Sequence, residues 1–303
     1  MLFAIGTAFL WAILPFALVP IFARLDVPSV IGFRFAFSFV ILFLWLGFKN
    51  NWKLKKIFAW SPMVLAAGAL LALNYFGFSH GLSLTTASTA QILIQTGPLI
   101  FTLIGLFVFR EKLNPVQIFG MALASVGFLL FYEEQLSNLL EGAQSFNLGV
   151  FWVFVGGLTW GVYAVFHKLA AKKYAPQTIN MSIYALATLL YLPFVKVQEF
   201  EKADSLLWAL LIFSGFNTVF AYGFLSEALK RTSATKVSLI ICLNPILTMI
   251  ISEVASQLDL HGIRHDNLKS MAWMGAICVV VGAIFVVSGK PKIAKDIATK
   301  ISE

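Results

Sequence analysis

A charged side chain stands inside a long apolar stretch of this chain. Arg34 lies about six residues past Pro28, which is about 9 Å of rise in a helix. An ionisable group at that depth in lipid is costly, so it is a functional hypothesis by default. One interpretation is an anchor for an anion or carboxylate that is reached from a central cavity. The other is a structural arginine that ties its helix to neighbouring carbonyls or to Gln91.

Aromatic, amide and hydroxyl side chains with helical spacing form a second candidate site. Several of them stand four residues apart, on one face of a helix. Aromatic walls with a few polar groups are the usual composition of a small-molecule site. The alternative is that the rings fill helix interfaces and that the amides join helices by hydrogen bonds. The candidate substrate-binding residues are Trp11, Tyr75, Ser79, Gln91, Gln95, Trp160, Tyr222, Ser226 and Asn244.

Patterns for catalysis and metal binding are weak. His261 and His265 have an H-x-x-x-H spacing but no flanking glutamate, so they do not match the zinc-protease motif. Cys242 and Cys278 lie in apolar segments, where neither indicates a disulfide or a metal site. The chain has no GxxxxGK[ST] phosphate loop. We therefore expect no metal, no cofactor and no enzymatic activity.

The composition defines the elements that must position these residues. The chain is 59% hydrophobic and 12% charged, whereas soluble domains carry about 25% charged residues. Apolar runs of about 18 residues or more recur, which is typical of membrane-spanning helices. The net charge of +8 is scattered over segment ends, so we expect no nucleic-acid partner. No basic region precedes the first segment, so we expect no cleavable signal peptide.

Ten apolar segments predict an all-α integral membrane protein with ten transmembrane helices. Prolines at helix starts cost no hydrogen bond, and Pro28, Pro115 and Pro176 stand there. Prolines inside a span predict a kink, and such prolines are Pro15, Pro98, Pro193 and Pro245. The expected spans are about 2–23, 29–48, 58–79, 85–109, 115–132, 147–168, 177–196, 205–229, 233–254 and 270–288.

The distribution of charge between the spans predicts their orientation. Lysine and arginine gather in the connections on the N-terminal side, such as 49–57, and positive loops stay in the cytoplasm. Acidic residues gather on the other side, as in 133–146. Both termini are therefore expected in the cytoplasm. The tail 290–303 reads as a short interfacial helix on the inner leaflet.

The sequence of one span is repeated later in the chain. Thr85–Ile104 aligns with Thr232–Ile251, with Pro98 and Pro245 standing 147 residues apart. Trp11 and Trp160, and also Tyr75 and Tyr222, match at nearly the same offset. Five spans per half is an odd number, so the second half must enter the membrane upside down. We expect inverted repeats at 1–132 and 147–289, joined by an external linker at 133–146, as in secondary transporters.

These features resemble the drug/metabolite transporter superfamily, EamA type, over about residues 2–288. The resemblance rests on Trp11, the Pro28-to-Arg34 stretch, the connection from Tyr75 to TTAS, Pro98, Glu111 and the duplicated ten-span plan. It implies export of amino acids or related metabolites, although the family also includes importers of nucleotide-like compounds. The family carries an arginine here whatever the substrate, which favours a structural role for Arg34. The second copy departs from the pattern after Ile251.

We therefore expect a secondary transporter that works by alternating access in the bacterial inner membrane. Its partners are a small-molecule substrate and the lipid bilayer, and its oligomeric state stays open. Kinks at Pro98 and Pro245 would act as paired hinges, or else as static packing features. His80 and Glu253, at outer helix ends, are candidates for proton coupling, although we favour their being solvated helix-end groups. An integral membrane enzyme and a channel are the alternatives from other classes.

Overall fold

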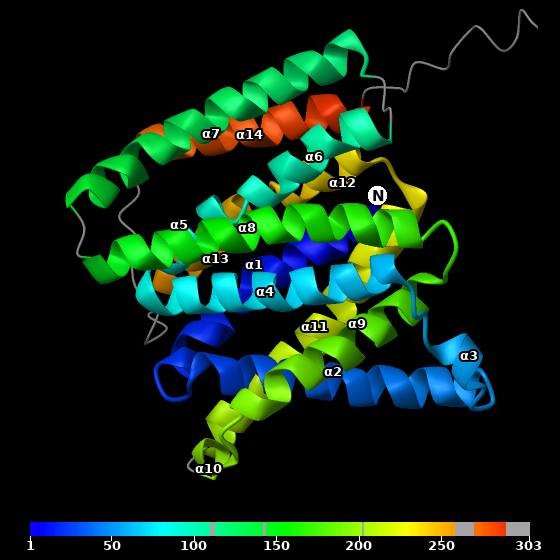
Figure 1. Cartoon of the computed structure of the whole chain (residues 1–303). Helices are drawn as coiled ribbons and strands as arrows, with labels where there is room; N and C mark the ends of the chain where they lie inside the picture. The colour runs from blue at the N-terminus through cyan, green and yellow to red at the C-terminus, as the bar shows by residue number, and fades with distance from the viewer. Residues whose placement is uncertain (110–112, 142–143, 202, 258–269, 289–303) are drawn as a thin grey trace, which may run out of the picture.

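Helices are the regular elements throughout residues 1–109, 113–141, 144–201, 203–257 and 270–288, the part that this computed structural model describes (Figure 1). No strand occurs in these ranges, so the expected all-α class is confirmed. The helices are α1 (Leu2–Phe22), α2 (Val27–Lys49), α3 (Leu54–Ile57), α4 (Pro62–Leu84), α5 (Ala87–Leu93), α6 (Thr96–Val108), α7 (Pro115–Glu141), α8 (Gln144–Ala170), α9 (Pro176–Tyr191), the 3₁₀ helix η1 (Leu192–Phe194), α10 (Val197–Phe200), α11 (Ser205–Arg231), α12 (Ala234–Ile241), α13 (Asn244–Gln257) and α14 (Ser270–Ser288).

Seven helical stretches in the described ranges are long and apolar enough to cross a membrane. This supports a multi-pass membrane protein. The other three expected spans coincide with α7, α9 and α14, whose apolar parts or whole lengths fall short of about 20 residues. The seven stretches are Leu2–Phe22, Val27–Lys49, Pro62–Leu84, Thr89–Val108, Asn147–Ala170, Ser205–Arg231 and Ala234–Ile251.

Some expected features lie on residues that the structure does not describe. Glu111, His261, His265 and the tail 290–303 are among them. The expected linker 133–146 is helical over most of its length, because α7 continues to Glu141 and α8 begins at Gln144.

Prolines begin several helices as expected, and an acidic residue caps α11. Pro28 and Pro176 lie in the first turns of α2 and α9, and Pro115 is the first residue of α7. Asp204 caps α11, since its Oδ1 accepts a hydrogen bond from the Leu207 N–H at 2.8 Å. That N–H, followed by Arg24 at 2.7 Å, holds the pKa of Asp204 below its ordinary value.

Prolines inside the chain have different effects. α1 runs through Pro15 and Pro20 without a break, whereas α9 ends at Tyr191 before Pro193. Pro98 and Pro245 each lie in the first turn of a new helix, α6 and α13, just after an interruption. The kinks expected at these two prolines coincide with short interruptions of the helix, two residues long in each case.

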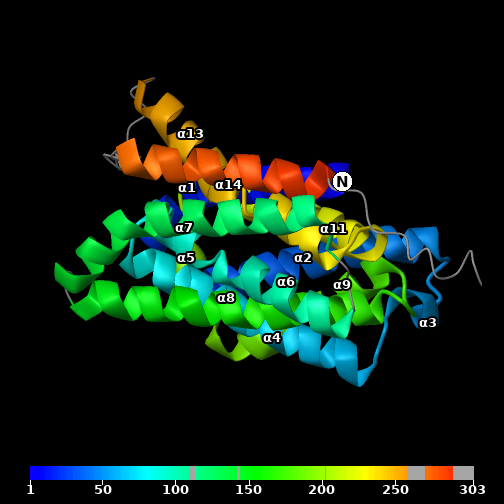
Figure 2. The ribbon, with the colours of Figure 1, turned by 90° about the horizontal axis from the view of Figure 1, so that it is seen from above.

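The main helix contacts join elements that are far apart in the sequence. α4 packs along α8, α1 along α11, α2 along α9 and α7 along α14. Figures 1 and 2 show α7 and α14 side by side at one edge of the bundle. Glycines allow close approach: a Cβ at Gly77 of α4 would lie 2.6 Å from the carbonyl oxygen of Trp152 on α8. In membranes, such small residues let helix backbones pack closely.

Gly77→Ala should therefore destabilise the fold. Overpacking of this kind costs about 1–3 kcal/mol, measured as a lower midpoint for unfolding of the detergent-solubilised protein. Gly223→Ala is the matched control, because its Cβ would meet nothing nearer than the Gln177 side chain at 3.7 Å. Equal midpoints for the two variants would contradict the role of close packing between α4 and α8.

Candidate functional site

Two broken helices meet at the centre of the protein. α5 and α6 are separated at Ile94–Gln95, and α12 and α13 at Cys242–Leu243. Irregular backbone at membrane depth is tolerated where it is buried in protein or lines a cavity. Here Gln95 in the first break and Asn244, directly after the second, line one pocket.

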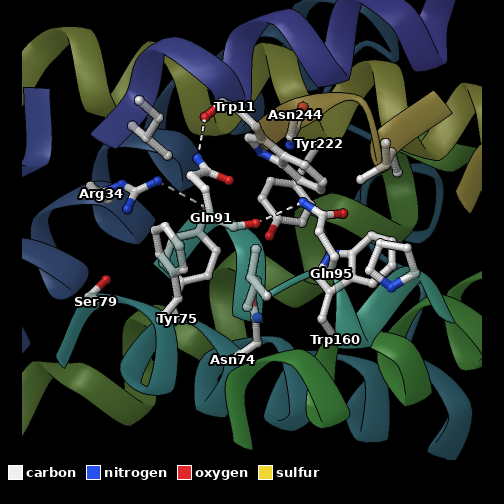
Figure 3. Close-up of a pocket in the computed structure, with 15 residues that line it drawn as sticks. Trp11, Arg34, Asn74, Tyr75, Ser79, Gln91, Gln95, Trp160, Tyr222 and Asn244 are labelled. Carbon is white, nitrogen blue, oxygen red and sulfur yellow. Dashed lines mark hydrogen bonds between the residues drawn. The ribbon is translucent and has the colours of Figure 1, made fainter. Parts of the chain in front are cut away.

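The pocket has about 570 Å³ of empty space, including the part that opens to solvent. Helices from both halves of the sequence contribute, as Figure 3 shows. The lining residues are Trp11, Leu14, Arg34, Asn74, Tyr75, Phe78, Ser79, Gln91, Ile94, Gln95, Pro98, Trp160, Tyr222, Ile241 and Asn244. The structure thus brings together every candidate substrate-binding residue except Ser226.

Aromatic rings from opposite halves pack against one another in the pocket wall. Trp11 and Trp160 have ring centroids 5.9 Å apart in an edge-to-face arrangement, and Trp11 lies 5.3 Å from Tyr222. Tyr75 and Tyr222 lie 5.8 Å apart. The residues that match each other in the sequence repeat are therefore in direct contact. These rings fill a helix interface and also line the pocket.

A proline in α1 explains the position of Gln91. In a regular helix the carbonyl of Trp11 would accept from the N–H four residues later, but that residue is Pro15, which has none. The Gln91 side chain of α5 donates to this carbonyl instead, from Nε2 at 3.0 Å. Gln95 Nε2 in turn donates to the carbonyl of Gln91 at 3.0 Å. The two amides thus complete hydrogen bonding at a site where the helix leaves an acceptor open.

Arg34 forms its hydrogen bonds with hydroxyl groups in the described structure. The structural role expected from the sequence named other partners, neighbouring carbonyls or Gln91. The Nε and Nη2 of Arg34 donate to Thr218 Oγ1 at 3.3 and 3.1 Å, and Nη2 lies 3.5 Å from the Tyr75 hydroxyl. The guanidinium carbon is 4.6 Å from the centroid of the Tyr75 ring, a cation–π geometry. Arg34 therefore joins α2 to α4 and α11. Thr218 was not among the predicted site residues, although Thr218 stands one helical turn before Tyr222.

Ser226 lies outside the pocket, in a buried polar cluster with His167 and Asn180. Its hydroxyl donates to Asn180 Oδ1 at 2.8 Å and lies 2.9 Å from His167 Nε2. Asn180 Nδ2 also donates to the carbonyl of Tyr222 at 3.0 Å. The cluster joins α8, α9 and α11 directly behind the pocket wall. No spacing signal in the sequence relates His167 to Asn180.

The remaining candidates fit no metal or catalytic arrangement. Among the described residues, no group of three or more His, Cys, Asp or Glu side chains could hold a metal ion. His80 stacks on Phe76, with ring centroids 5.2 Å apart. Glu253 lies in α13, and its side chain falls outside the described part of the structure.

Comparison with known proteins points to transporters. The model of a family described as the EamA-like transporter family matches residues 1–132 and 147–288. An "Uncharacterized transporter" of Haemophilus influenzae is 29% identical over 285 residues, 93% of this chain and 92% of that protein. The "Uncharacterized inner membrane transporter YhbE" of Escherichia coli K12 is 27% identical over 287 residues, 94% of this chain and 89% of that protein.

A solved crystal structure of a protein shares the fold. Its TM-score is 0.68 at 17% identity, over 94% of this chain and 95% of that chain.

The bond between Gln91 and the Trp11 carbonyl can be tested by a double-mutant cycle. Gln91→Leu should cost about 1–3 kcal/mol of stability, because it leaves a buried acceptor without a donor. In a Pro15→Ala background the helix supplies its own N–H to that carbonyl, so the same change should cost clearly less. Unfolding midpoints of the four proteins measure the coupling. An equal cost in both backgrounds would show that this carbonyl does not explain the position of Gln91.

Proposed function

The chain belongs to the EamA-like transporter family, and we propose that it is a secondary transporter that moves a small organic metabolite by alternating access. The observation that carries this proposal is the pocket at the meeting point of two broken helices. Broken helices around a central site are typical of secondary transporters. The family assignment argues against an integral membrane enzyme.

The proposed architecture is two inverted five-helix repeats, at 1–132 and 147–289. Helix contacts support it, because α1 on α11 and α4 on α8 are equivalent pairs once the halves are exchanged. Glycines give the same support at α7 and α14. A Cβ at Gly120 would lie 2.6 Å from the carbonyl of Gly282, and one at Gly127 would lie 2.6 Å from the carbonyl of Gly275. In the sequence repeat, Gly120 corresponds to Gly275 and Gly127 corresponds to Gly282. Exchanging the two halves therefore converts the contact of Gly120 with Gly282 into the contact of Gly275 with Gly127.

We assign the substrate to the pocket, with Trp11, Tyr75, Trp160 and Tyr222 as its aromatic wall. Ser79, Gln91, Gln95 and Asn244 supply its polar groups. If both termini are cytoplasmic, Ser79 and Gln91 lie near the outer ends of their helices, which puts the pocket in the outer half of the membrane. The structure would then correspond to an outward-facing state. Pro98 and Pro245 are the proposed hinges for the change to the inward-facing state.

We propose amino acids or related compounds as substrates, with export as the direction. The proposed location is the bacterial inner membrane, in line with the name of the Escherichia coli relative. The sequence has no phosphate-binding loop for ATP, so the energy would come from the substrate gradient or an ion gradient. His80 and Glu253 remain the candidates if protons take part.

Counterflow in proteoliposomes tests the transporter proposal. Vesicles preloaded with one unlabelled L-amino acid at a time should accumulate the labelled form transiently and with saturation. A channel gives flux without counterflow, and an enzyme gives neither. Tyr222→Asp should abolish the signal in a folded protein because it places a charge in the aromatic wall, whereas Tyr174→Asp, in the turn after α8, should leave it unchanged. Absence of counterflow for every related metabolite tried would refute the proposal.

Labelling of single cysteines tests the proposed topology. In a background without Cys242 and Cys278, Ser137→Cys should react with a membrane-impermeant maleimide added outside intact cells. Lys53→Cys should react only after the cells are opened. The opposite pattern would invert the protein in the membrane and place the pocket in the inner half.

A further inference from the structure

Arg34 gives the pocket a positive charge that no other described lining residue balances. Among the described residues that line the pocket it is the one that is charged at neutral pH, since the others are apolar, aromatic, amide or hydroxyl side chains. Arg34 is only 2% exposed, and arginine does not lose its proton in proteins. A buried charge without an opposite charge loses hydration that nothing replaces. The pocket is therefore electrostatically suited to an anion.

The hydroxyl partners of Arg34 cannot satisfy its hydrogen-bonding capacity. Thr218 Oγ1 is approached by Arg34 Nε, by Arg34 Nη2 and by the Tyr75 hydroxyl at 3.2 Å. It also donates its own proton to the carbonyl of Ser214 at 3.0 Å. One hydroxyl oxygen has fewer lone pairs than this set of donors requires. In the described part of the chain, the hydrogen bonds of Arg34 use Nε and Nη2, and Nη1 makes none. A carboxylate, with two oxygens in one plane, is the matching partner for a guanidinium.

The opposite wall of the pocket has hydrogen-bond acceptors that lack a donor. Gln95 Oε1 and Asn244 Oδ1 are buried acceptors without a hydrogen-bond partner in the described part of the structure. The orientation of Gln95 follows from its own Nε2, which donates to the carbonyl of Gln91 at 3.0 Å. Figure 3 shows Arg34 on one side of the pocket and both amides on the other, with aromatic rings between them. Buried acceptors of this kind are expensive unless a donor reaches them.

We propose that the pocket binds a small metabolite by its carboxylate, which pairs with Arg34, while an N–H or O–H group of the same molecule donates to Gln95 and Asn244. This inference rests on the proposed transport function and specifies the substrate class of the same site. The structural role that the sequence favoured for Arg34 is compatible with it. The bonds to Thr218 and Tyr75 hold the guanidinium in place between three helices, and that rigidity orients its remaining N–H groups toward the ligand.

Thermal stabilisation of the purified full-length protein tests the inference. The probes are the twenty L-amino acids, their carboxamides, and the amines that result when the carboxylate is removed. We expect the compounds that raise the melting temperature to be carboxylates, and their carboxamides and amines to be inactive. Arg34→Gln should weaken binding at least tenfold and Arg34→Lys less, because lysine keeps the charge without the planar geometry. Arg24→Gln removes the same charge from the surface and is the matched control.

A second variant keeps the test decisive if Arg34→Gln does not fold. Ser79→Asp retains the arginine and supplies a competing carboxylate to the pocket from α4, so it should also abolish binding of the active probes. The inference is overturned if a carboxamide or amine stabilises the protein as well as its parent. It is also overturned if no carboxylate stabilises the protein, or if folded Arg34→Gln binds as tightly as the wild type.

Failure of this inference and failure of the transport proposal are distinguishable. Saturable counterflow of a neutral or cationic compound would refute the carboxylate site and leave the transporter intact. Arg34-dependent binding of a carboxylate without counterflow would do the opposite.

Discussion

Lipid offers no hydrogen bonds to a protein backbone, and this constraint shapes the centre of the molecule. Every buried N–H and carbonyl must find its partner inside the protein. Where the helices are regular, the requirement is met without side chains. It becomes demanding where a proline inside a helix removes a donor, as Pro15 does for the Trp11 carbonyl beside the pocket. Two side chains in the pocket wall, Gln91 and Gln95, thus complete the backbone.

The same constraint determines how the polar residues are divided. Some complete helices, as Gln91 does for α1, and some join helices to one another, as Asn180 and Ser226 do behind the pocket. Others, including Gln95 Oε1 and Asn244 Oδ1, have no protein partner in the described structure. In a native interior most buried polar groups are paired. Four of the unpaired groups in the described structure line the pocket, where the proposed ligand would supply their partners.

The sequence predicted much of this site, for a definable reason. Helical spacing and the repeat identify which residues share a face and which positions correspond, so Trp11, Trp160, Tyr75 and Tyr222 could be selected together. Spacing does not determine which neighbouring helix that face meets. This is why Thr218 and His167 were missed and why Ser226 was placed with its repeat partner Ser79 instead of behind the wall. The sequence was also a limited guide to the number of membrane spans. The span expected at 177–196 corresponds to α9, which has only 16 residues.

The hydrogen bond from Gln91 to the Trp11 carbonyl also restricts how the protein can move. In a dry interior, α5 cannot separate from α1 unless another donor replaces the amide at that carbonyl. Water can do so, and so can an N–H or O–H group of a ligand. The hydrogen bond therefore opposes separation of α5 from α1 when the pocket is empty and dry. It can be replaced when water or a ligand fills the pocket. One proline in α1 thereby links the proposed change between transport states to water or a ligand at the Trp11 carbonyl.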